Sequence, residues 1–288
     1  MGTHTHISLN MKAKIKKLLI KIGLYTWLIF MSLVVLIPIV WIIGSSFNES
    51  SSLTHASMIP TNPTLRHYKE LFTETNYLRW YWNTFKIASM NVVVTVILST
   101  TTGYIFGRLN FKGKKASLLT ILVMQMFPSF LGMTALYVLF LTFGLLDSHW
   151  ALILLYGAGS IPGNTWLLKG YLNSIPKELD ESAMLDGASK TQVFLKIILP
   201  LIRPMVTFFA IGAFMGPWMD FIFPRLILSS NENLTLAVGL HGMITGNANN
   251  YYTRFAAGAV LVAIPMTVMF IAVQKHMVEG LSAGATKG

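Results

Sequence analysis

Long apolar runs alternate with short polar stretches along this chain, which predicts helices that cross a membrane. A membrane-spanning helix needs about 20 consecutive, mostly apolar residues. Six segments meet this requirement, at residues 20–43, 84–106, 117–141, 150–169, 205–227 and 255–277. The pattern therefore predicts an all-α integral membrane protein with six transmembrane helices.

Proline or glycine–proline sequences interrupt three of these runs, at Pro128, Pro162 and Gly216-Pro217. Proline is tolerated inside a span where a neighbouring helix or water satisfies the carbonyl that it leaves without a partner. We interpret the breaks as the sign of a bundle around a pathway rather than of plain anchors. The pathway candidates are polar residues at membrane depth with one adjoining tryptophan: Gln125, Asn164, Trp218 and Asp220.

Two Gly-x-x-x-Gly sequences lie within the runs, at Gly103–Gly107 and Gly212–Gly216. Such sequences mark close contacts between membrane helices, although they are also common by chance in glycine-rich spans.

The composition and the distribution of charge support a membrane protein and give its orientation. Of the 288 residues, 53% are hydrophobic and 11% are charged, against about 25% charged in ordinary soluble domains. With the N-terminus inside, 16 of the 22 Lys and Arg fall on the cytoplasmic side. This asymmetry predicts an N-in, C-in protein and explains the net charge of +11 better than a nucleic-acid groove does. The chain has no cysteine, which excludes disulfides and thiolate chemistry.

The apolar run at the N-terminus follows several lysines and extends from Leu18 to Ile43. It is longer than the roughly 7–15 residues of a signal-peptide core, so we interpret it as a retained first span. The expected organisation is a flexible cytoplasmic N-terminus at 1–17, a membrane domain at 18–280 and a cytoplasmic tail at 281–288.

A polar, acidic stretch separates the fourth and fifth runs at about 172–204, on the predicted cytoplasmic side. Its early acidic residues complement the N-terminal dipole of a helix; they are Glu178, Asp180 and Glu181. Pro176 suits the first turn of that helix, and Gly187 suits its end. Ser189 and Gln192 fit a capping box that opens a second helix. The stretch predicts two short helices around a glycine turn, either as a contact for a soluble partner or as an ordinary solvated loop.

The same stretch resembles the EAA loop of binding-protein-dependent ABC importers. The matching residues are Glu181-Ser182-Ala183, Asp186-Gly187-Ala188, Phe194, Ile197, Leu199-Pro200 and Pro204, with Ser182 in place of an alanine. Phe255-Ala-Ala-Gly-Ala259 and the segment after Gln274-Lys275 look like MalG-type permease subunits of carbohydrate importers. The similarity covers most of the chain from about residue 20.

This resemblance implies a type I ABC importer permease fold in a bacterial plasma membrane, with oligosaccharides of the maltose or maltodextrin kind as substrate. It implies a second homologous permease subunit, an extracytoplasmic sugar-binding protein and a cytoplasmic ATPase dimer that binds ATP and Mg. The ATPase would dock on Glu181, Ser182, Ala183, Asp186, Gly187 and Ala188, with Phe194 and Pro200 bracing this element against the fifth span. We call residues 172–204 the EAA segment.

Two further contacts are implied by the same resemblance. The tail residues Thr286, Lys287 and Gly288 would reach the ATPase interface; the alternative is a frayed terminus. An outer loop would enter the binding protein through Asn247, Asn249, Asn250, Tyr251 and Tyr252. The alternative for this loop is a polar turn with tyrosines at the membrane interface.

Rival functions lack support in the sequence. No Gly-x-x-x-x-Gly-Lys-Ser/Thr sequence occurs, so the ATPase must be another chain, and we assign no catalytic residue, metal or cofactor to this one. An ion-coupled secondary transporter would need ionisable residues in mid-membrane, and the runs contain almost none. An ABC permease for another solute, such as another oligosaccharide or a glycerol phosphate, stays open.

Overall fold

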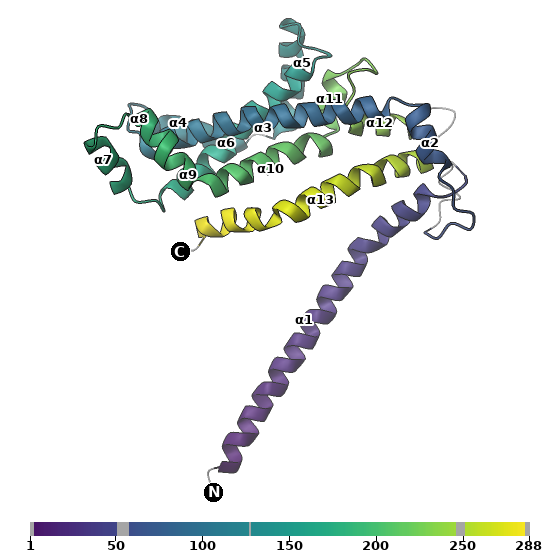
Figure 1. Cartoon of the computed structure of the whole chain (residues 1–288), viewed down its shortest axis with the longest axis horizontal. Coiled ribbons are helices and arrows are strands. Elements are labelled where there is room, and N and C mark those ends of the chain that lie inside the picture. The colour runs from purple at the N-terminus through teal and green to yellow at the C-terminus, as the bar shows by residue number, and fades with distance from the viewer. Residues whose placement is uncertain (1–2, 51–57, 127, 246–250, 286–288) are drawn as a thin grey trace.

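The structure is a computed structural model that describes residues 3–50, 58–126, 128–245 and 251–285 (Figure 1). Throughout this part of the chain the regular secondary structure is helical, which confirms the all-α prediction. Four helices are each long and apolar enough to cross a membrane. They are α1 (Thr3–Ser46), α3 (Tyr77–Arg108), α6 (His149–Leu172) and α13 (Tyr252–Ala285).

Two bent pairs of helices bring the number of candidate spans to six. In the first pair, α4 (Lys114–Met126) is followed, through the 3-10 turn η2 (Ser129–Gly132), by α5 (Met133–Thr142) at 89°. In the second, residues Lys190–Leu201 meet α10 (Arg203–Met219) at 77°. The described residues thus contain four candidate spans, or six if each bent pair is one span, and the third predicted run is sharply bent at the expected Pro128.

The expected proline breaks have different outcomes. Helix α6 continues through Pro162 without interruption. Helix α10 ends at Met219, two residues after Pro217, and a separate α11 (Ile222–Ile227) follows. The fifth predicted span is thus not one continuous helix to residue 227, because the backbone becomes extended at Asp220.

Helices α3, α6 and α10 pack side by side as the centre of the bundle (Figure 1). Gly103 and Gly107 let α6 approach α3 closely, since an added Cβ would lie 2.5 Å from Leu168 and 2.6 Å from Leu172. The close contact predicted for this pair of glycines is confirmed. Gly212 and Gly216 differ, because an added Cβ at either would meet nothing within 4 Å.

The EAA segment lies at one end of the bundle, and the outer loops lie at the other (Figure 1). The EAA end holds α7 (Glu178–Leu185), α8 (Lys190–Val193), the π-helical η3 (Phe194–Ile198) and α9 (Leu199–Leu201). The outer end holds α2 (Arg66–Thr73), α11 and α12 (Leu236–Gly242).

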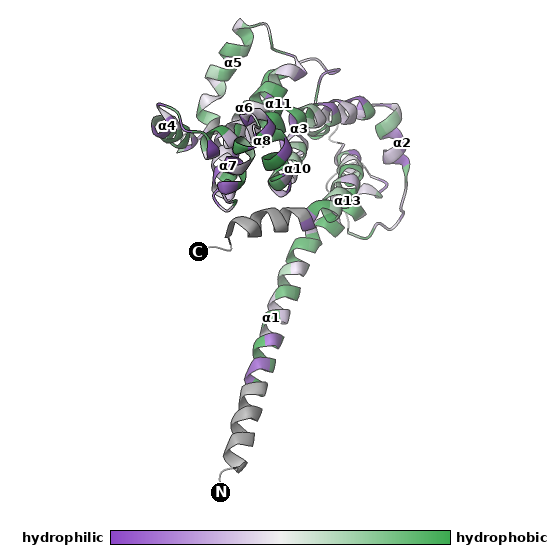
Figure 2. Ribbon diagram, turned by 60° about the vertical axis from the view of Figure 1, so that its left-hand side comes forward, coloured by the Kyte–Doolittle hydropathy of each residue, from purple (hydrophilic) through white to green (hydrophobic). Residues whose placement is uncertain are grey.

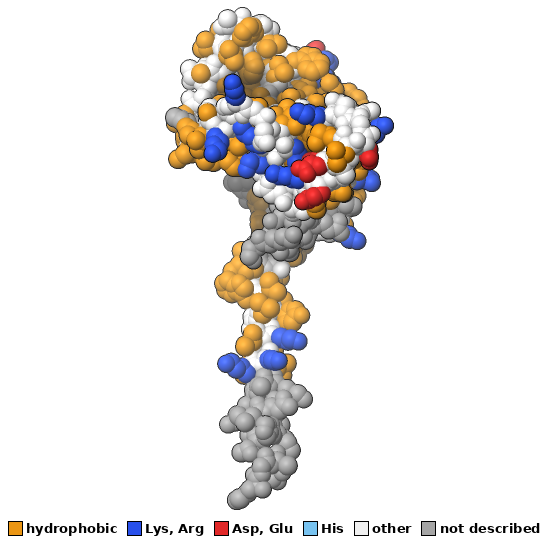
Figure 3. All heavy atoms as spheres, turned by 90° about the vertical axis from the view of Figure 1, so that its left-hand side faces the viewer, with side chains coloured by type: hydrophobic (Ala, Val, Ile, Leu, Met, Phe, Trp, Pro, Cys, Tyr) orange, Lys and Arg blue, Asp and Glu red, His pale blue; other side chains and the backbone are white. Residues whose placement is uncertain are grey.

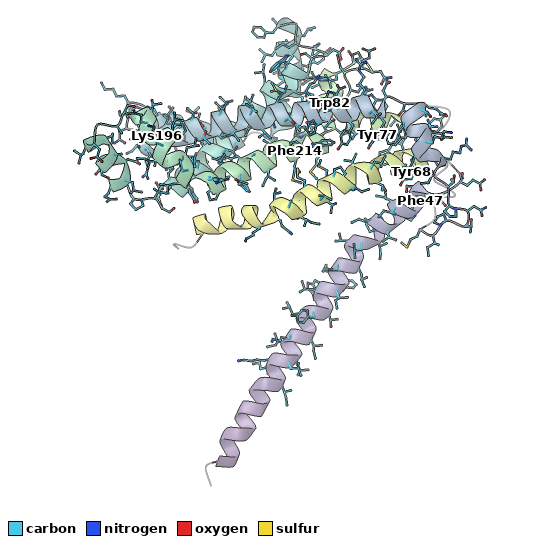
Figure 4. The ribbon with its side chains drawn as sticks, in the orientation of Figure 1. Phe47, Tyr68, Tyr77, Trp82, Lys196 and Phe214 are labelled. Atoms are coloured by element: carbon cyan, nitrogen blue, oxygen red, sulfur yellow. The ribbon has the colours of Figure 1, made fainter. Side chains whose placement is uncertain are left out.

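Three consecutive aromatic residues at the outer end, Trp80, Tyr81 and Trp82, differ in their exposure. Trp82 is exposed beside Phe85, as a residue at the membrane interface would be (Figure 4). Trp80 is instead buried, and its Nε1 donates to the Asn231 carbonyl at 3.0 Å. Tyr81 packs edge-on against Trp218, with ring centroids 5.0 Å apart. Two of the three aromatic residues at 80–82 therefore fix the fold rather than contact headgroups.

Helix α1 leaves the bundle, and the part of it that adjoins the bundle is mostly hydrophobic (Figures 1 and 2). It begins at Thr3, so helix extends into the stretch expected to be flexible, as α13 extends into the expected tail. The side chains from Ile15 to Trp41 are exposed. The C-terminal end is anchored, because Ser46 Oγ lies 2.8 Å from Tyr68 Oη and Phe47 packs on Tyr68 (Figure 4).

Candidate functional site

The first helix of the EAA segment is closed by a complete C-terminal cap. Ala188 N donates to Ala183 O at 2.9 Å and Gly187 N donates to Met184 O at 3.1 Å. This pair of bonds is a Schellman motif, which needs a left-handed residue after the helix. Gly187 supplies it with φ = +87°, so the predicted glycine stop is confirmed.

The second helix opens with the predicted capping box. Ser189 Oγ accepts from Gln192 N at 3.3 Å, and Gln192 Oε1 accepts from Ser189 N at 2.7 Å. Pro176 was placed wrongly in the first turn of α7, because Lys177 is the N-cap and Pro176 precedes it. Because the C-terminus of α7 and the N-terminus of α8 are both capped, the turn between these two helices is a short stiff unit.

The residues expected to dock a partner divide between surface and core. Glu181, Ser182, Asp186 and Gly187 are exposed. The small residues Ala183 and Ala188 instead pack against a buried cluster shared by α3, α6, η3 and α10.

An exposed apolar residue accompanies the acidic ones on this end of the molecule. Leu185, the last residue of α7, is 88% exposed. Leu179 and Met184 are also exposed. Viewed from this end, acidic side chains lie among numerous Lys and Arg side chains (Figure 3). The surface thus combines charges of both signs with unburied apolar groups, a composition suited to a protein partner.

A buried ion pair holds α7 against the end of α3. Arg108 Nε lies 2.9 Å from Asp180 Oδ2, and the two side chains are 4% and 11% exposed. Arg108 Nη2 also donates to the Ile175 carbonyl at 2.9 Å. Burial raises the pKa of the Asp180 carboxyl, and the Arg108 guanidinium opposes this shift. Sequence reasoning missed this pair, since it assigned Asp180 to the helix dipole and Arg108 to the orientation of the chain.

Of the two residues expected to brace the segment, Phe194 is packed against other helices and Pro200 is not buried. The Phe194 ring lies 4.7 Å from the ring of Tyr104 on α3, and it packs against the cluster that includes Met205 and Phe209 of α10. Pro200 is exposed. Phe194 therefore contacts α3 as well as the expected fifth span.

A cavity of about 790 Å³ opens between α3, α6, α10 and the η2–α5 and α11 segments. Its polar lining residues are Asn91, Thr95, Tyr156, Ser160, Asn164 and Asp220. Its aromatic lining residues are Phe130, Phe208, Phe209 and Phe223. The unpacked glycines Gly212 and Gly216 line it too, which leaves the cavity wide on the α10 side.

Two of the four pathway candidates line this cavity. Asp220 accepts a hydrogen bond from Tyr156 Oη at 2.8 Å, and its other oxygen caps the start of α11 by accepting from Ile222 N at 2.9 Å. Asn164 Nδ2 donates to Ser99 Oγ at 2.9 Å, which ties α6 to α3. Sequence reasoning missed Tyr156, because a tyrosine in an apolar run gives no signal without its partner.

The other two candidates lie elsewhere. Gln125 is exposed on α4. Trp218 is buried and lines a separate, largely apolar pocket of about 460 Å³ between α10, α12 and α13.

The outer end carries a polar pocket of about 860 Å³ beside a group of charges. Tyr251 and Arg254 line it, and the Arg254 guanidinium lies 4.6 Å from the Tyr251 ring centre. Arg254 Nη2 is 2.8 Å from both Glu70 Oε2 and Glu74 Oε2. Burial acts to raise the pKa of Glu70, but hydrogen bonds from Arg254 and Arg66 outweigh it and hold that pKa at about 2. The Arg254 guanidinium therefore already covers one face of the Tyr251 ring.

Several expected site residues lie outside the described part of the chain. They are Asn247, Asn249 and Asn250 of the outer loop and Thr286, Lys287 and Gly288 of the tail. Tyr252, the first residue of α13, is half-buried. Within the described residues, no group of three or more His, Asp or Glu side chains is placed to hold a metal ion.

Comparison with known proteins decides the family. A model described as "Binding-protein-dependent transport system inner membrane component" matches residues 99–279. The chain belongs to this family. It is therefore an integral component of the cytoplasmic membrane, as the EAA resemblance indicated.

The named relatives are sugar transport permeases. The chain is 46% identical over 267 residues to the galactooligosaccharides transport system permease protein GanQ of Bacillus subtilis, covering 92% of this chain and 94% of that one. It is 42% identical to the maltodextrin transport system permease protein MdxG of the same organism, covering 96% and 100%.

The fold matches that of a solved transporter. A chain from a bacterial ABC transporter involved in import of the acidic polysaccharide alginate superposes with a TM-score of 0.78 at 22% identity. The match covers 89% of this chain and 96% of that one. At this identity the likeness shows the fold alone, and it is an ABC permease fold.

Proposed function

We propose that this chain is the permease subunit of an ATP-driven importer that takes up oligosaccharides. The relatives at 46% and 42% identity are named for galactooligosaccharides and maltodextrins, and each aligns over more than nine-tenths of its length. Maltose and maltodextrins are the first candidate substrates. The identity to the galactooligosaccharide permease supports that sugar class as the second.

The EAA segment is the proposed docking element for a cytoplasmic ATPase dimer. The observation that carries this proposal is α7 with its closed C-terminal cap, which presents Glu181, Asp186 and Leu185 to the outside. A rigid element passes on a displacement that a loose loop would absorb. ATP and Mg would be bound by the ATPase, and this chain itself would catalyse no reaction.

The cavity is the proposed contribution of this chain to the sugar pathway. Polar groups such as Asn164 and Asp220 suit sugar hydroxyls, and the aromatic rings of Phe208 and Phe209 suit the apolar faces of pyranose rings. Transport would follow from alternating access, in which ligand and nucleotide bind two conformations with different affinity.

A second permease subunit is the proposed partner within the membrane. Two apolar surfaces could contact this second subunit in place of lipid. They are the exposed side chains of α1 and the pocket beside Trp218. At the outer end, a sugar-binding protein would meet the loop at Asn247 to Tyr252. The tail at Thr286 to Gly288 would reach the ATPase.

Reconstitution with partner chains tests this function. The chain would be co-expressed with the second permease, the ATPase and the binding protein encoded with it, and placed in proteoliposomes. We expect ATP-dependent uptake of labelled maltotriose that competes with unlabelled maltodextrins. Uptake of a labelled galactooligosaccharide without uptake of labelled maltotriose would select the second candidate. ATP-independent uptake on an ion gradient would contradict the proposal.

A further inference from the structure

The last turn of α3 holds the EAA segment at two places. Arg108 binds α7 through Asp180, at 2.9 Å, and binds the chain before α7 through the Ile175 carbonyl, also at 2.9 Å. Tyr104, one turn earlier, packs on Phe194 of η3 with ring centroids 4.7 Å apart. Both helical parts of the segment are thus attached to the same end of the same membrane helix.

The ion pair is of the kind that resists separation. Removing one partner from a buried pair leaves an uncompensated charge away from water, which is far more costly than breaking an exposed pair. Arg108 and Asp180 are 4% and 11% exposed, whereas Arg79 and Glu232, which pair at 3.0 Å on the outer side, are 53% and 68% exposed. We expect the buried pair to persist when α7 is displaced.

The covalent route from the segment to α10 is less direct. It passes through the π-helical η3 and a bend of 77° at Ile202, between Pro200 and Pro204. By contrast, α3 is packed tightly on α6 through Gly103 and Gly107. A force applied to α7 therefore meets a rigid pair of helices before it meets the bend.

We propose that Arg108 and Asp180 are positioning residues that transmit displacement of α7 to the α3–α6 pair, in parallel with the covalent path to α10. This inference rests on the proposed docking of the ATPase on α7. Asn91 and Thr95 of α3 and Tyr156 of α6 line the cavity. The movement thus reaches the cavity wall without passing through the bend at Ile202.

The test measures ATP hydrolysed per sugar imported by the full transporter in proteoliposomes. We expect Arg108→Ala and Asp180→Asn each to raise this ratio about fivefold or more, the lower end of ordinary coupling factors. The charge-exchanged double variant, Arg108→Asp with Asp180→Arg, should recover part of the coupling. Arg79→Ala, which breaks the exposed pair, is the matched control and should leave the ratio unchanged.

Two outcomes would overturn the proposal: single variants that keep the wild-type ratio, or an exchanged variant no better than the single ones. If the proposed function itself is wrong, the result differs: the wild-type complex would show no sugar-stimulated ATP hydrolysis or uptake.

A distance measurement covers the case in which Arg108→Ala does not assemble. The chain has no cysteine, so labels at Glu178→Cys in α7 and Ile97→Cys in α3 would be the only thiol labels on this subunit. In the assembled transporter, we expect the spin–spin distance to stay constant between nucleotide-free and ATP-bound states. Asp180→Asn should make it change or broaden. A wild-type distance that changes with ATP, or an Asp180→Asn distribution identical to wild type, contradicts the proposal.

Discussion

Asn91 of α3 donates from Nδ2 to the Ala213 carbonyl of α10 at 2.8 Å. Ala213 lies four residues before Pro217, so its carbonyl is the one that lost its helical partner, because proline has no N–H. The buried amide of Asn91 replaces that missing donor from a neighbouring helix. The break near the end of α10 is therefore supported by a side chain at the cavity wall.

Removing this support should destabilise the protein in a way that depends on Pro217. We expect Asn91→Ala to cost about 1–3 kcal/mol, the usual penalty for leaving a buried polar group unsatisfied. In a Pro217→Ala background, residue 217 has an N–H for Ala213, so Asn91→Ala should cost less. Thermal unfolding in detergent of all four variants gives the interaction energy. Additive effects would show that the two residues act independently.

Gly187 should tolerate substitution poorly for conformational reasons alone. An added Cβ meets nothing within 4 Å there, but φ is +87°. We expect Gly187→Ala to cost about 1–2 kcal/mol, the penalty of a left-handed conformation, and Gly187→Pro to abolish coupled uptake while the chain still inserts. Gly163 in α6 is the control, since it is equally uncrowded but helical. Gly163→Ala should be neutral or stabilising, and equal effects at both sites would contradict the explanation.

The Gly103 contact predicts a size limit where α3 meets α6. Gly103→Ala places a methyl group 2.5 Å from the Leu168 side chain, and overpacking of this kind costs about 1–3 kcal/mol. Leu168→Ala in the same chain should not restore the stability, because the Cβ of residue 168 still lies 2.7 Å from the added methyl group. Gly212→Ala, which meets open space, should be tolerated. Melting temperatures of purified variants test this, and a tolerated Gly103→Ala would refute the close contact.

The outer charge cluster predicts acid sensitivity. The pKa of Glu70 is about 2 in the folded protein against its ordinary 4.5. Because the folded value is the lower one, the stabilisation is complete above about pH 5 and is lost as the pH falls toward 2, by at most about 3 kcal/mol. Melting temperatures between pH 7 and 3 should fall less for Glu70→Gln than for wild type. Glu232→Gln removes an exposed partner and serves as the control. A Glu70→Gln curve parallel to wild type would exclude this residue as the cause.

The features that depend on local sequence were predictable. Apolar runs gave the spans, and Gly187, Ser189 and Gln192 gave the caps, because each rule involves residues a few positions apart. The family resemblance drew attention to the EAA segment for the same reason. Pro162 shows the limit of such rules, since α6 continues through it.

The features that depend on tertiary contact were not predictable. Arg108 and Asp180 are 72 positions apart in the sequence and meet only when α3 and α7 do. Tyr156 is recognisable as a site residue only from its hydrogen bond to Asp220, 64 positions away. Trp80 is buried against Gly239 of α12, and its Nε1 donates to the carbonyl of Asn231, 151 positions away. A single sequence gives no local signal that residues so far apart will contact each other.

The divergence of α1 has a consequence for biogenesis. The side chains of α1 from Ile15 to Trp41 are exposed, so the rest of the chain buries little of this helix. Folding of the single subunit therefore leaves most of its surface without protein contacts. In the membrane, lipid covers this apolar surface until a neighbouring subunit replaces it. A chain made in excess of its partner would therefore keep lipid, rather than protein, along this helix.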